Sequence, residues 1–266
     1  MTATRPWCAL VAVALLSGCA RRPPTAAGDR TPEEVVALAR ARALPDPLQG
    51  RFSIRLRSDR LDVAGSTGGA IVLDPPGRGH LAIFGPLGGP WYTLSTDGEA
   101  LSVVATREQR HFVEGDADAL VARWVPGLRD VDELFGLLVG RVPLEDERLQ
   151  GVRALDDGRV MALLDGGDGV VVSVVLRPTD GTPASLVAQR GDSRLLAATF
   201  AEFEDGAGAL LPTDVAVEVP GLDLRVDLEY RSWRRPDPVP DVFGVSAPPG
   251  FTTEPLGPLL EAVARD

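Results

Sequence analysis

The feature that most constrains the fold is a two-residue alternation of apolar and polar side chains. It is clearest in residues 222–231, where leucine, valine or tyrosine occupies every second position and a charged residue follows each of them. Successive side chains of a β-strand point to opposite faces of the sheet, so this segment is predicted to be a strand with one buried and one exposed face. The same period begins near the other end of the chain, at Phe52 and Ile54.

Comparable segments form two series, which are interrupted by Pro, Gly and Asp-Gly turn signals. The first series continues from Phe52 through 61–74, 79–85, 91–96, 100–106 and 109–114; the second covers 152–155, 159–165, 170–177, 184–190, 194–203, 214–219 and 222–232. Short, evenly spaced strands are typical of antiparallel meanders, and Asp97-Gly98 is a favourable hairpin turn. We therefore predict a mainly β (α+β) chain.

Four short helices are predicted beside these strands. Residues 31–44 begin with Thr31, Pro32 and Glu34, a combination typical of a capped helix N-terminus. Residues 116–126 and 131–139 repeat apolar side chains with the 3.6-residue helical period, so each has one broad apolar face that needs a partner. A final short helix is expected around 258–264.

The N-terminus has the three parts of a secretory signal peptide: Arg5, an apolar stretch from Ala9 to Leu16, and small residues. Leu16-Ser17-Gly18-Cys19 resembles a bacterial lipobox. This resemblance implies that residues 1–18 are removed, that Cys19 is lipidated and acylated, and that residues 19–30 are a linker. Ala20 is compatible with the outer membrane. The alternative is an ordinary signal peptide with an accidental cysteine.

Composition and motifs favour a non-enzymatic binding protein. The formal net charge is −11 and all 27 basic residues are arginine, which argues against a nucleic-acid partner. A P-loop needs a lysine and is excluded. His80 and His111 belong to neither a zinc-protease nor a Cys/His metal spacing, and we interpret both as locally satisfied strand residues. We predict no catalytic residues, no metal and no cofactor.

Three stretches resemble the LolA/LolB lipoprotein-carrier family: residues 50–54, residues 81–88, and residues 134–143. The order of lipobox, linker, helix, meander, two helices and second meander is most similar to its lipid-anchored member LolB, or to related lipoprotein domains of unknown function. The resemblance implies a curved antiparallel sheet forming an incomplete barrel, with short amphipathic helices capping an apolar cavity. It assigns residues 31–235 to a LolB-like half-barrel domain and residues 236–266 to a Pro-rich extension.

By this resemblance the chain is a monomeric outer-membrane lipoprotein with its body in the periplasm. It would accept the acyl chains of lipoproteins from a periplasmic carrier and insert them into the outer membrane. The alternative is a lipid-anchored binding or scaffold lipoprotein of the same fold in envelope assembly. The expected lining of the acyl cavity is Phe52, Ile54, Leu120, Trp124, Leu134, Phe135 and Leu138.

Leu87 is the residue singled out for membrane insertion. Pro86, Leu87 and Gly88 place one large apolar side chain in a turn, where no strand alternation buries it. In the family the matching leucine projects from a loop and helps to insert cargo. The alternative is that Leu87 folds back onto the core beside Trp91.

Overall fold

Strands make up most of the molecule, as the alternation predicts. We analysed a computed structural model of the chain, which describes residues 30–42, 44–59 and 63–265. The first series comprises β1 (Leu48–Ser58), β2 (Val63–Asp74), β3 (Arg78–Phe84), β4 (Pro90–Asp97), β5 (Leu101–Ala105) and β6 (Arg110–Glu114). The second comprises β7 (Leu149–Ala154), β8 (Val160–Asp165), β9 (Val170–Leu176), β10 (Pro183–Arg190), β11 (Ser193–Phe200), β14 (Asp214–Val219) and β15 (Leu224–Arg234).

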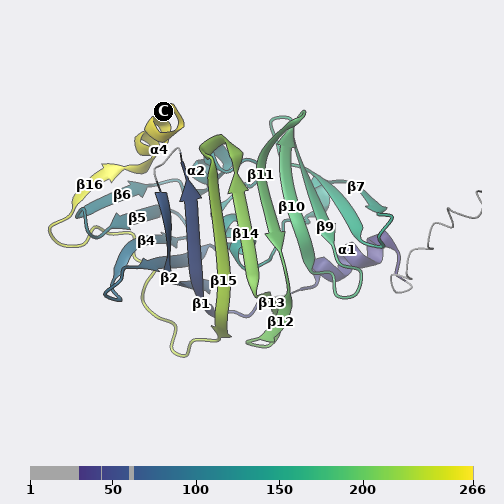
Figure 1. Cartoon of the computed structure of the whole chain (residues 1–266), viewed down its shortest axis with the longest axis horizontal. Coiled ribbons are helices and arrows are strands. Elements are labelled where there is room, and N and C mark those ends of the chain that lie inside the picture. Colours follow the sequence, from purple (N-terminus) through teal and green to yellow (C-terminus); the bar gives the residue numbers. More distant parts are fainter. Residues whose placement is uncertain (1–29, 43, 60–62, 266) are drawn as a thin grey trace, which may run out of the picture.

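Both series belong to one 14-stranded sheet, because β1 pairs antiparallel with β15 (Figure 1). The strand order is β16-β6-β5-β4-β3-β2-β1-β15-β14-β11-β10-β9-β8-β7. β16 (Thr252–Pro255) lies at one end of this order and β7 at the other, and each has a single neighbour among the described strands. The sheet is curved and open, which confirms the expected mainly β class.

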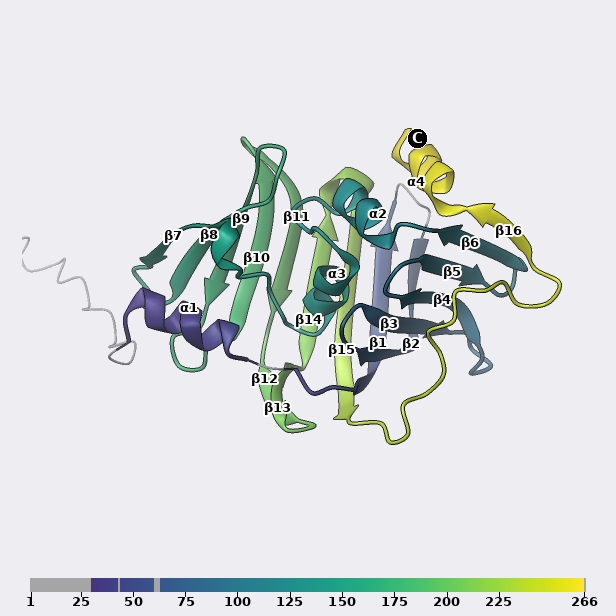
Figure 2. The ribbon, with the colours of Figure 1, turned by 180° about the vertical axis from the view of Figure 1, so that it is seen from behind.

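The helices are short, and the second and third of them in chain order lie across the inner face of the curved sheet (Figure 2). They are α1 (Pro32–Arg40), α2 (Ala117–Trp124), α3 (Val131–Leu138) and α4 (Leu256–Arg265), with 3₁₀ turns η1 (Asp146–Arg148) and η2 (Pro220–Leu222). The Thr31 side chain accepts from the Glu34 backbone and Glu34 accepts from Thr31, so the predicted capping box is present. Because β6 and β7 lie near opposite ends of the sheet, the chain must cross the sheet between them, and α2 and α3 form this crossing.

The hydrophobic core lies between the inner face of the sheet and these helices. In β9, residues Val170, Val172, Val174 and Leu176 are all buried and alternate with half-buried residues. From α3, Phe135 packs against β3 at Gly79, where a Cβ atom would lie 2.6 Å from the ring. The apolar faces predicted for residues 116–126 and 131–139 therefore pack on the sheet.

Three strands differ from the sequence prediction. Segment 194–203 is two strands, because the chain leaves β11 at Phe200 and enters a hairpin of β12 (Phe203–Gly206) and β13 (Ala209–Pro212). The Pro-rich segment after β15 supplies β16, which pairs parallel with β6. Neither β13 nor β16 shows sustained alternation over its four residues, and β16 pairs with the edge that β6 leaves open.

The contact of Phe135 with the sheet can be tested at Gly79. We expect Gly79→Ala to lower the free energy of unfolding by about 1–3 kcal/mol, because the new methyl group would displace the Phe135 ring. Gly65→Ala is the matched control, since no atom lies within 4 Å of the added Cβ in β2. Urea unfolding compares them; equal losses for both variants would contradict the packing of α3 on β3.

Candidate functional site

Leu87 projects from the turn between β3 and β4 and is fully exposed. The turn is closed by two backbone hydrogen bonds: Gly85 N–H donates to the Gly89 carbonyl at 2.8 Å, and Gly88 N–H donates to the Gly85 carbonyl at 2.9 Å. Gly88 has a φ of +84°, which L-residues rarely adopt. Leu87 therefore does not fold back onto the core beside Trp91.

The Trp91 indole lies at the base of the turn that carries Leu87. This ring lies against Gly85, where an added Cβ would approach its Nε1 atom to 2.1 Å. The turn that follows β5 supports the arrangement, because Thr106 N–H donates to the Trp91 carbonyl at 2.9 Å. The turn is consequently held out from the sheet by its glycines and by packing.

All seven residues predicted to line an acyl cavity belong to the hydrophobic core or pack against it. Phe52, Ile54, Leu120 and Phe135 are buried in the core, whereas Trp124, Leu134 and Leu138 are partly buried and pack against it. The four buried side chains are closed off from solvent. Tyr230 adds to the cluster: its ring meets Phe52 edge-on at 5.5 Å between centroids, and its hydroxyl donates to the Leu138 carbonyl at 2.7 Å.

One polar atom in this cluster has no protein partner among the described residues. The indole Nε1 of Trp124 is buried and makes no hydrogen bond there. A buried donor without a partner costs about 1–3 kcal/mol. The indole N–H of Trp124 is thus the group in the apolar core that could most readily donate a hydrogen bond to an oxygen atom of a bound ligand.

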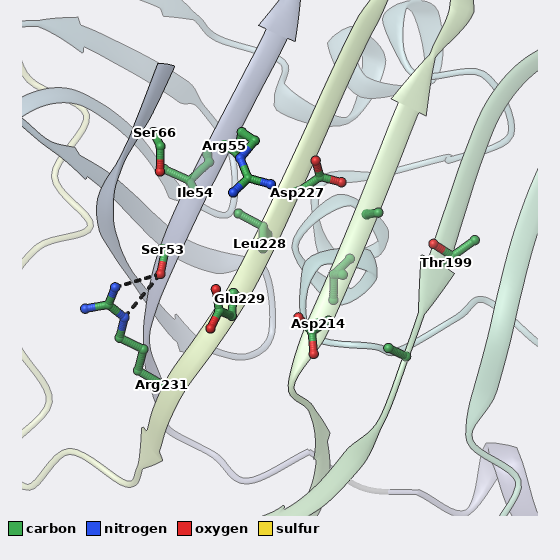
Figure 3. Close-up of a pocket in the computed structure, with 13 residues that line it drawn as sticks. Ser53, Ile54, Arg55, Ser66, Thr199, Asp214, Asp227, Leu228, Glu229 and Arg231 are labelled. Atoms are coloured by element: carbon green, nitrogen blue, oxygen red, sulfur yellow. Dashed lines mark hydrogen bonds between the residues drawn. The ribbon is translucent and has the colours of Figure 1, made fainter. Parts of the chain in front are cut away.

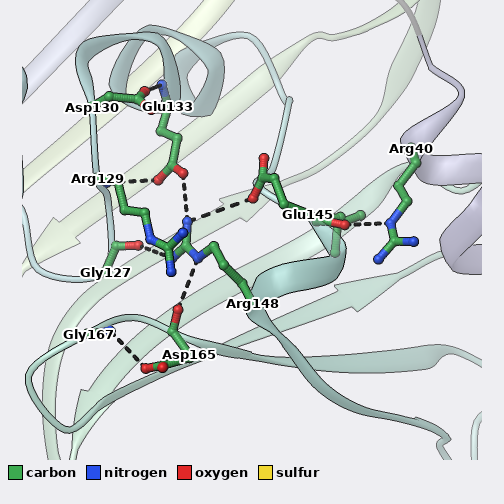
Figure 4. Close-up of polar contacts among 10 residues, drawn as sticks. Arg40, Gly127, Arg129, Asp130, Glu133, Glu145, Arg148, Asp165 and Gly167 are labelled. Carbon is green, nitrogen blue, oxygen red and sulfur yellow. Dashed lines mark hydrogen bonds and ion pairs between the residues drawn. The ribbon is translucent and has the colours of Figure 1, made fainter.

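A buried arginine that the sequence did not suggest ties the crossing helices to the sheet (Figure 4). The Arg148 side chain is fully buried in η1. Its Nη1 donates to Glu133 of α3 at 2.6 Å, and its Nη2 donates to the Gly127 carbonyl between α2 and α3 at 2.8 Å. Its Nε donates to the Asp165 carbonyl at the end of β8, at 2.9 Å. We call this set of contacts the Arg148 latch.

Glu133 is the carboxylate of the latch. Burial raises the pKa of Glu133 above its ordinary value, and the positive charge of Arg148 partly opposes this rise. The carboxylate also accepts from the Arg129 backbone at 2.9 Å. A charged pair removed from water in this way is stable only while both members are present.

A second group of contacts holds the C-terminal segment on the outer face of the sheet. His111 is buried, and its Nε2 lies 3.0 Å from Ser102 Oγ and 3.1 Å from the Val245 carbonyl. Because a carbonyl only accepts, Nε2 carries the proton. His80 Nδ1 lies 2.8 Å from Ser95 Oγ. Both histidines are satisfied structurally, as the sequence interpretation proposed.

His80 has a perturbed environment. Burial lowers the pKa of His80, and a hydrogen bond to the Val242 backbone partly opposes the shift. Ser95 Oγ also donates to the Val242 carbonyl at 3.5 Å. The segment that follows β15 is thus attached to the first meander through both histidines and their partner serines.

A polar groove with a volume of about 420 Å³ lies on the outer face of the sheet, away from α2 and α3 (Figure 3). It crosses β1, β15 and β14, and charged side chains such as Arg55, Asp214 and Asp227 line it. Arg231 donates to Ser53 Oγ at its edge, at 2.9 Å. Such a lining does not suit acyl chains, so the groove is not a candidate for the predicted cavity.

Some of the sequence predictions concern residues that the structure does not describe. Cys19, the signal peptide of residues 1–18 and most of the linker 19–30 lie outside the described residues. Within the described ranges, no helix is long and apolar enough to span a membrane. In the same ranges, no three His, Cys, Asp or Glu side chains gather in a way that could hold a metal ion.

A similar architecture occurs in several proteins of solved structure. A LolA superfamily protein from Nitrosomonas europaea matches with a TM-score of 0.51 and 14% identity, covering 79% of this chain and 97% of that chain. A DUF1329 family protein from Desulfovibrio piger matches with a TM-score of 0.52 and 13% identity over 80% of this chain and 97% of that chain.

A third structure, a domain from Vibrio parahaemolyticus whose name assigns it to outer membrane lipoprotein sorting, matches with a TM-score of 0.52 and 13% identity. It covers 76% of this chain and 90% of that chain. By sequence, the chain matches neither a protein-family model nor a curated protein. The chain is therefore similar in fold to LolA-superfamily proteins and lipoprotein-sorting domains, at identities that show the fold alone.

The Arg148 latch can be measured with a double-mutant cycle. Arg148→Met should lower the free energy of unfolding by about 3–5 kcal/mol, because it leaves Glu133 buried and unpaired. Arg148→Met/Glu133→Leu should recover a large part of this loss. Arg159→Met is the control, since its ion pair with Asp157 is exposed and contributes at most about 1 kcal/mol. Additive losses in the double variant would contradict the latch.

The attachment at His80 should weaken in acid. Because the folded-state pKa is lowered, the neutral form is favoured by folding, so its stabilising effect is present above about pH 6.5 and is lost as pH falls through the folded pKa. The protection factors of the Val242–Val245 amides, which correct the hydrogen-exchange rates for their intrinsic pH dependence, should therefore fall in acid, and His80→Asn should abolish that fall. The pKa of Glu133 is raised in the folded state, so this residue makes the fold more stable in acid, opposite to His80. A measurement at the C-terminal segment itself is therefore required, rather than one of global stability. A pH-independent wild type would refute the assignment.

Proposed function

We propose that this protein is a lipid-anchored receptor of the outer membrane, similar to LolB, which accepts the acyl chains of lipoproteins from a periplasmic carrier and inserts them into the membrane. The observation that carries the proposal is the fully exposed Leu87 on a rigid turn of a LolA-like fold. The N-terminal Leu16-Ser17-Gly18-Cys19 supports attachment through Cys19. The receptor contributes binding and position, and no bond of the cargo is broken.

The acyl chain would bind between the inner face of the sheet and helices α2 and α3. The cluster around Phe52, Leu120 and Phe135 is closed, so entry requires the helices to move away from the sheet. Each CH₂ group buried there stabilises the complex by about 0.8 kcal/mol. The unpaired Nε1 of Trp124 would donate to the ester or amide carbonyl at the head of the chain.

Opening would begin at the Arg148 latch, since this residue links α3 and the connection between α2 and α3 to the sheet. Its contacts are polar and local, so they can break without unfolding of the strands. The capped start of α3, where Asp130 accepts from the Glu133 backbone, keeps the helix intact as it moves. The two helices would therefore act together as a lid.

A second function remains in a different class: a lipid-anchored binding or scaffold protein of the same fold in envelope assembly. The C-terminal segment favours it, because β16 and the contacts of His111 add a structured surface to the outside of the sheet. The discriminating experiment mixes the purified protein with a lipoprotein-loaded carrier. A receptor strips the lipoprotein from the carrier, whereas a scaffold leaves it in place.

Leu87→Glu tests the proposed insertion step. We expect cargo to be accepted from the carrier at the wild-type level, while its transfer to outer-membrane vesicles falls at least about tenfold, because a charge replaces the apolar side chain. Leu210→Glu is the control, since Leu210 is also an exposed leucine but lies in the β12–β13 hairpin.

Depletion of the protein in cells gives the second readout for the same proposal. Lipoproteins should accumulate outside the outer-membrane fraction. Normal lipoprotein sorting after depletion, or equal transfer of cargo to vesicles by Leu87→Glu and the wild type, would refute the receptor function.

A further inference from the structure

The segment that follows β15 lies along the first meander and is held there at a few points. Figure 2 shows it running from the end of β15 to β16. Within residues 235–255, all of which the structure describes, only Pro236 and Phe243 are buried. The segment therefore adds little apolar burial to the fold. We call residues 242–255 the strap.

The face beneath the strap is made of hydrogen-bonding side chains. His80, Ser95 and Ser102 lie directly opposite one another on β3, β4 and β5, and His111 follows on β6. They point away from the core, because Gly79, which precedes His80, faces α3. Three of them are nonetheless buried, since the strap covers them. We call these four residues the polar row.

The polar row contacts the strap through two backbone oxygens and one hydroxyl. Ser95 Oγ donates to the Val242 carbonyl at 3.5 Å, and His111 Nε2 donates to the Val245 carbonyl at 3.1 Å. His111 Nδ1 lies 3.2 Å from Thr253 Oγ1. Every residue of a polypeptide has a backbone carbonyl, so the row fixes an extended chain with little selection of its sequence.

Two arginines select side chains at the two ends of the strap. The Arg78 guanidinium lies over the Phe243 ring, 5.1 Å from its centroid. Arg110 donates to both carboxylate oxygens of Glu254, through Nε at 3.1 Å and through Nη2. Beside this ion pair, β16 adds a strand to the edge of β6. The surface thus combines an aromatic contact, a carboxylate contact and a strand edge, which are features of peptide recognition.

We propose that this outer face is a peptide-binding surface, that the strap is its exchangeable resident, and that its partner is an extended protein segment with an aromatic residue and a carboxylate spaced as in Phe243 and Glu254. The partner segment adds a parallel strand to β6 in place of β16. The inference goes beyond the proposed function, since it requires neither cargo nor a membrane.

The contacts of the strap suit exchange. β16 pairs over four residues only, in the parallel arrangement that is less stable per residue. The Arg110–Glu254 ion pair remains accessible to water, which weakens it. A permanently covered face is normally apolar, whereas water can solvate the polar row when the strap leaves. The strap therefore separates from the sheet while the core stays folded.

Hydrogen exchange of the wild type tests this local separation. The Thr252 amide donates to the Gln109 carbonyl at 3.0 Å, so it is protected only while the strap is bound. Its protection factor should be at least about 100-fold below that of Val172 in the core strand β9. Protection equal to that of Val172 overturns an exchangeable strap.

A labelled peptide tests the surface directly. The probe is a fluorescein-labelled peptide of residues 241–256, and the protein is the mature chain with Cys19→Ser. The attached strap competes at high effective concentration, so the wild type should bind the probe weakly. Phe243→Ser/Glu254→Gln in the protein should raise the affinity at least about tenfold. Val239→Ser is the matched control, since Val239 is an exposed apolar residue that precedes the strap.

Charge reversal tests the chemistry of the partner. In the strap-weakened protein, Arg110→Glu should lower the affinity for the probe at least about tenfold, and a peptide with Glu254→Arg should restore it. A peptide that keeps Phe243 and Glu254 but has a shuffled sequence between them should bind comparably, because the polar row contacts mainly backbone atoms. Phe243→Ser in the peptide should abolish binding.

Failure of the strap-weakened protein to bind the probe, with a folded circular-dichroism spectrum, overturns the peptide-binding surface. Equal affinity for the Phe243→Ser peptide also overturns it. If this variant does not fold, an excess of probe added to the wild type decides: the protection of Thr252 should fall as the probe displaces β16, and unchanged protection refutes the exchange. These readouts involve no carrier, so failure of the receptor function leaves the inference intact.

Discussion

The pairing of β1 with β15 is the interaction on which the rest of the structure depends. It joins strands that begin at Leu48 and Leu224, and it continues from Gln49↔Arg234 to Arg57↔Arg225 with one irregularity. Without it the two meanders would be separate sheets, each with an additional free edge. With it, the inner faces of both series become one continuous apolar surface. The segment that connects β6 to β7 must cross this surface, and its two amphipathic helices are the cover that the surface requires.

That cover is held by two different kinds of interaction. Apolar packing, such as Phe135 on Gly79, is strong but not directional and is preserved when an acyl chain replaces a side chain. The Arg148 latch is directional and is lost entirely once its partners separate. A buried ion pair is a weak source of net stability compared with apolar packing of the same volume, and it is better suited to defining one closed position. The helices therefore have a defined closed state on a core that is able to accept other apolar groups.

The sequence predicted the parts of this structure whose pattern is local. Alternation located the strands, and the helical period and the Thr31–Glu34 cap located the helices; Leu87 was expected to be exposed because no alternation could bury it. The latch was not predictable, since Arg148 lies in an acidic stretch that reads as a solvated loop, and its partners are 15 to 21 residues away. β16 was missed for the same reason, because its partner β6 lies over 130 residues away. The likeness to solved structures confirms the fold, while LolB-like activity stays a proposal.

Under the proposed function, the closed state also gives transfer its direction. A CH₂ group gains about 0.8 kcal/mol on leaving water for either the protein interior or the bilayer, so this gain cancels when cargo passes between them. The difference that remains is the cost of holding the helices open. Breaking the Arg148 latch leaves charged groups without their partners, at a cost of about 3–5 kcal/mol if they stay buried. Released cargo lets the latch close again, which by itself favours the bilayer by roughly two to four orders of magnitude. Release of cargo to the bilayer then needs no energy source, because this last step is downhill.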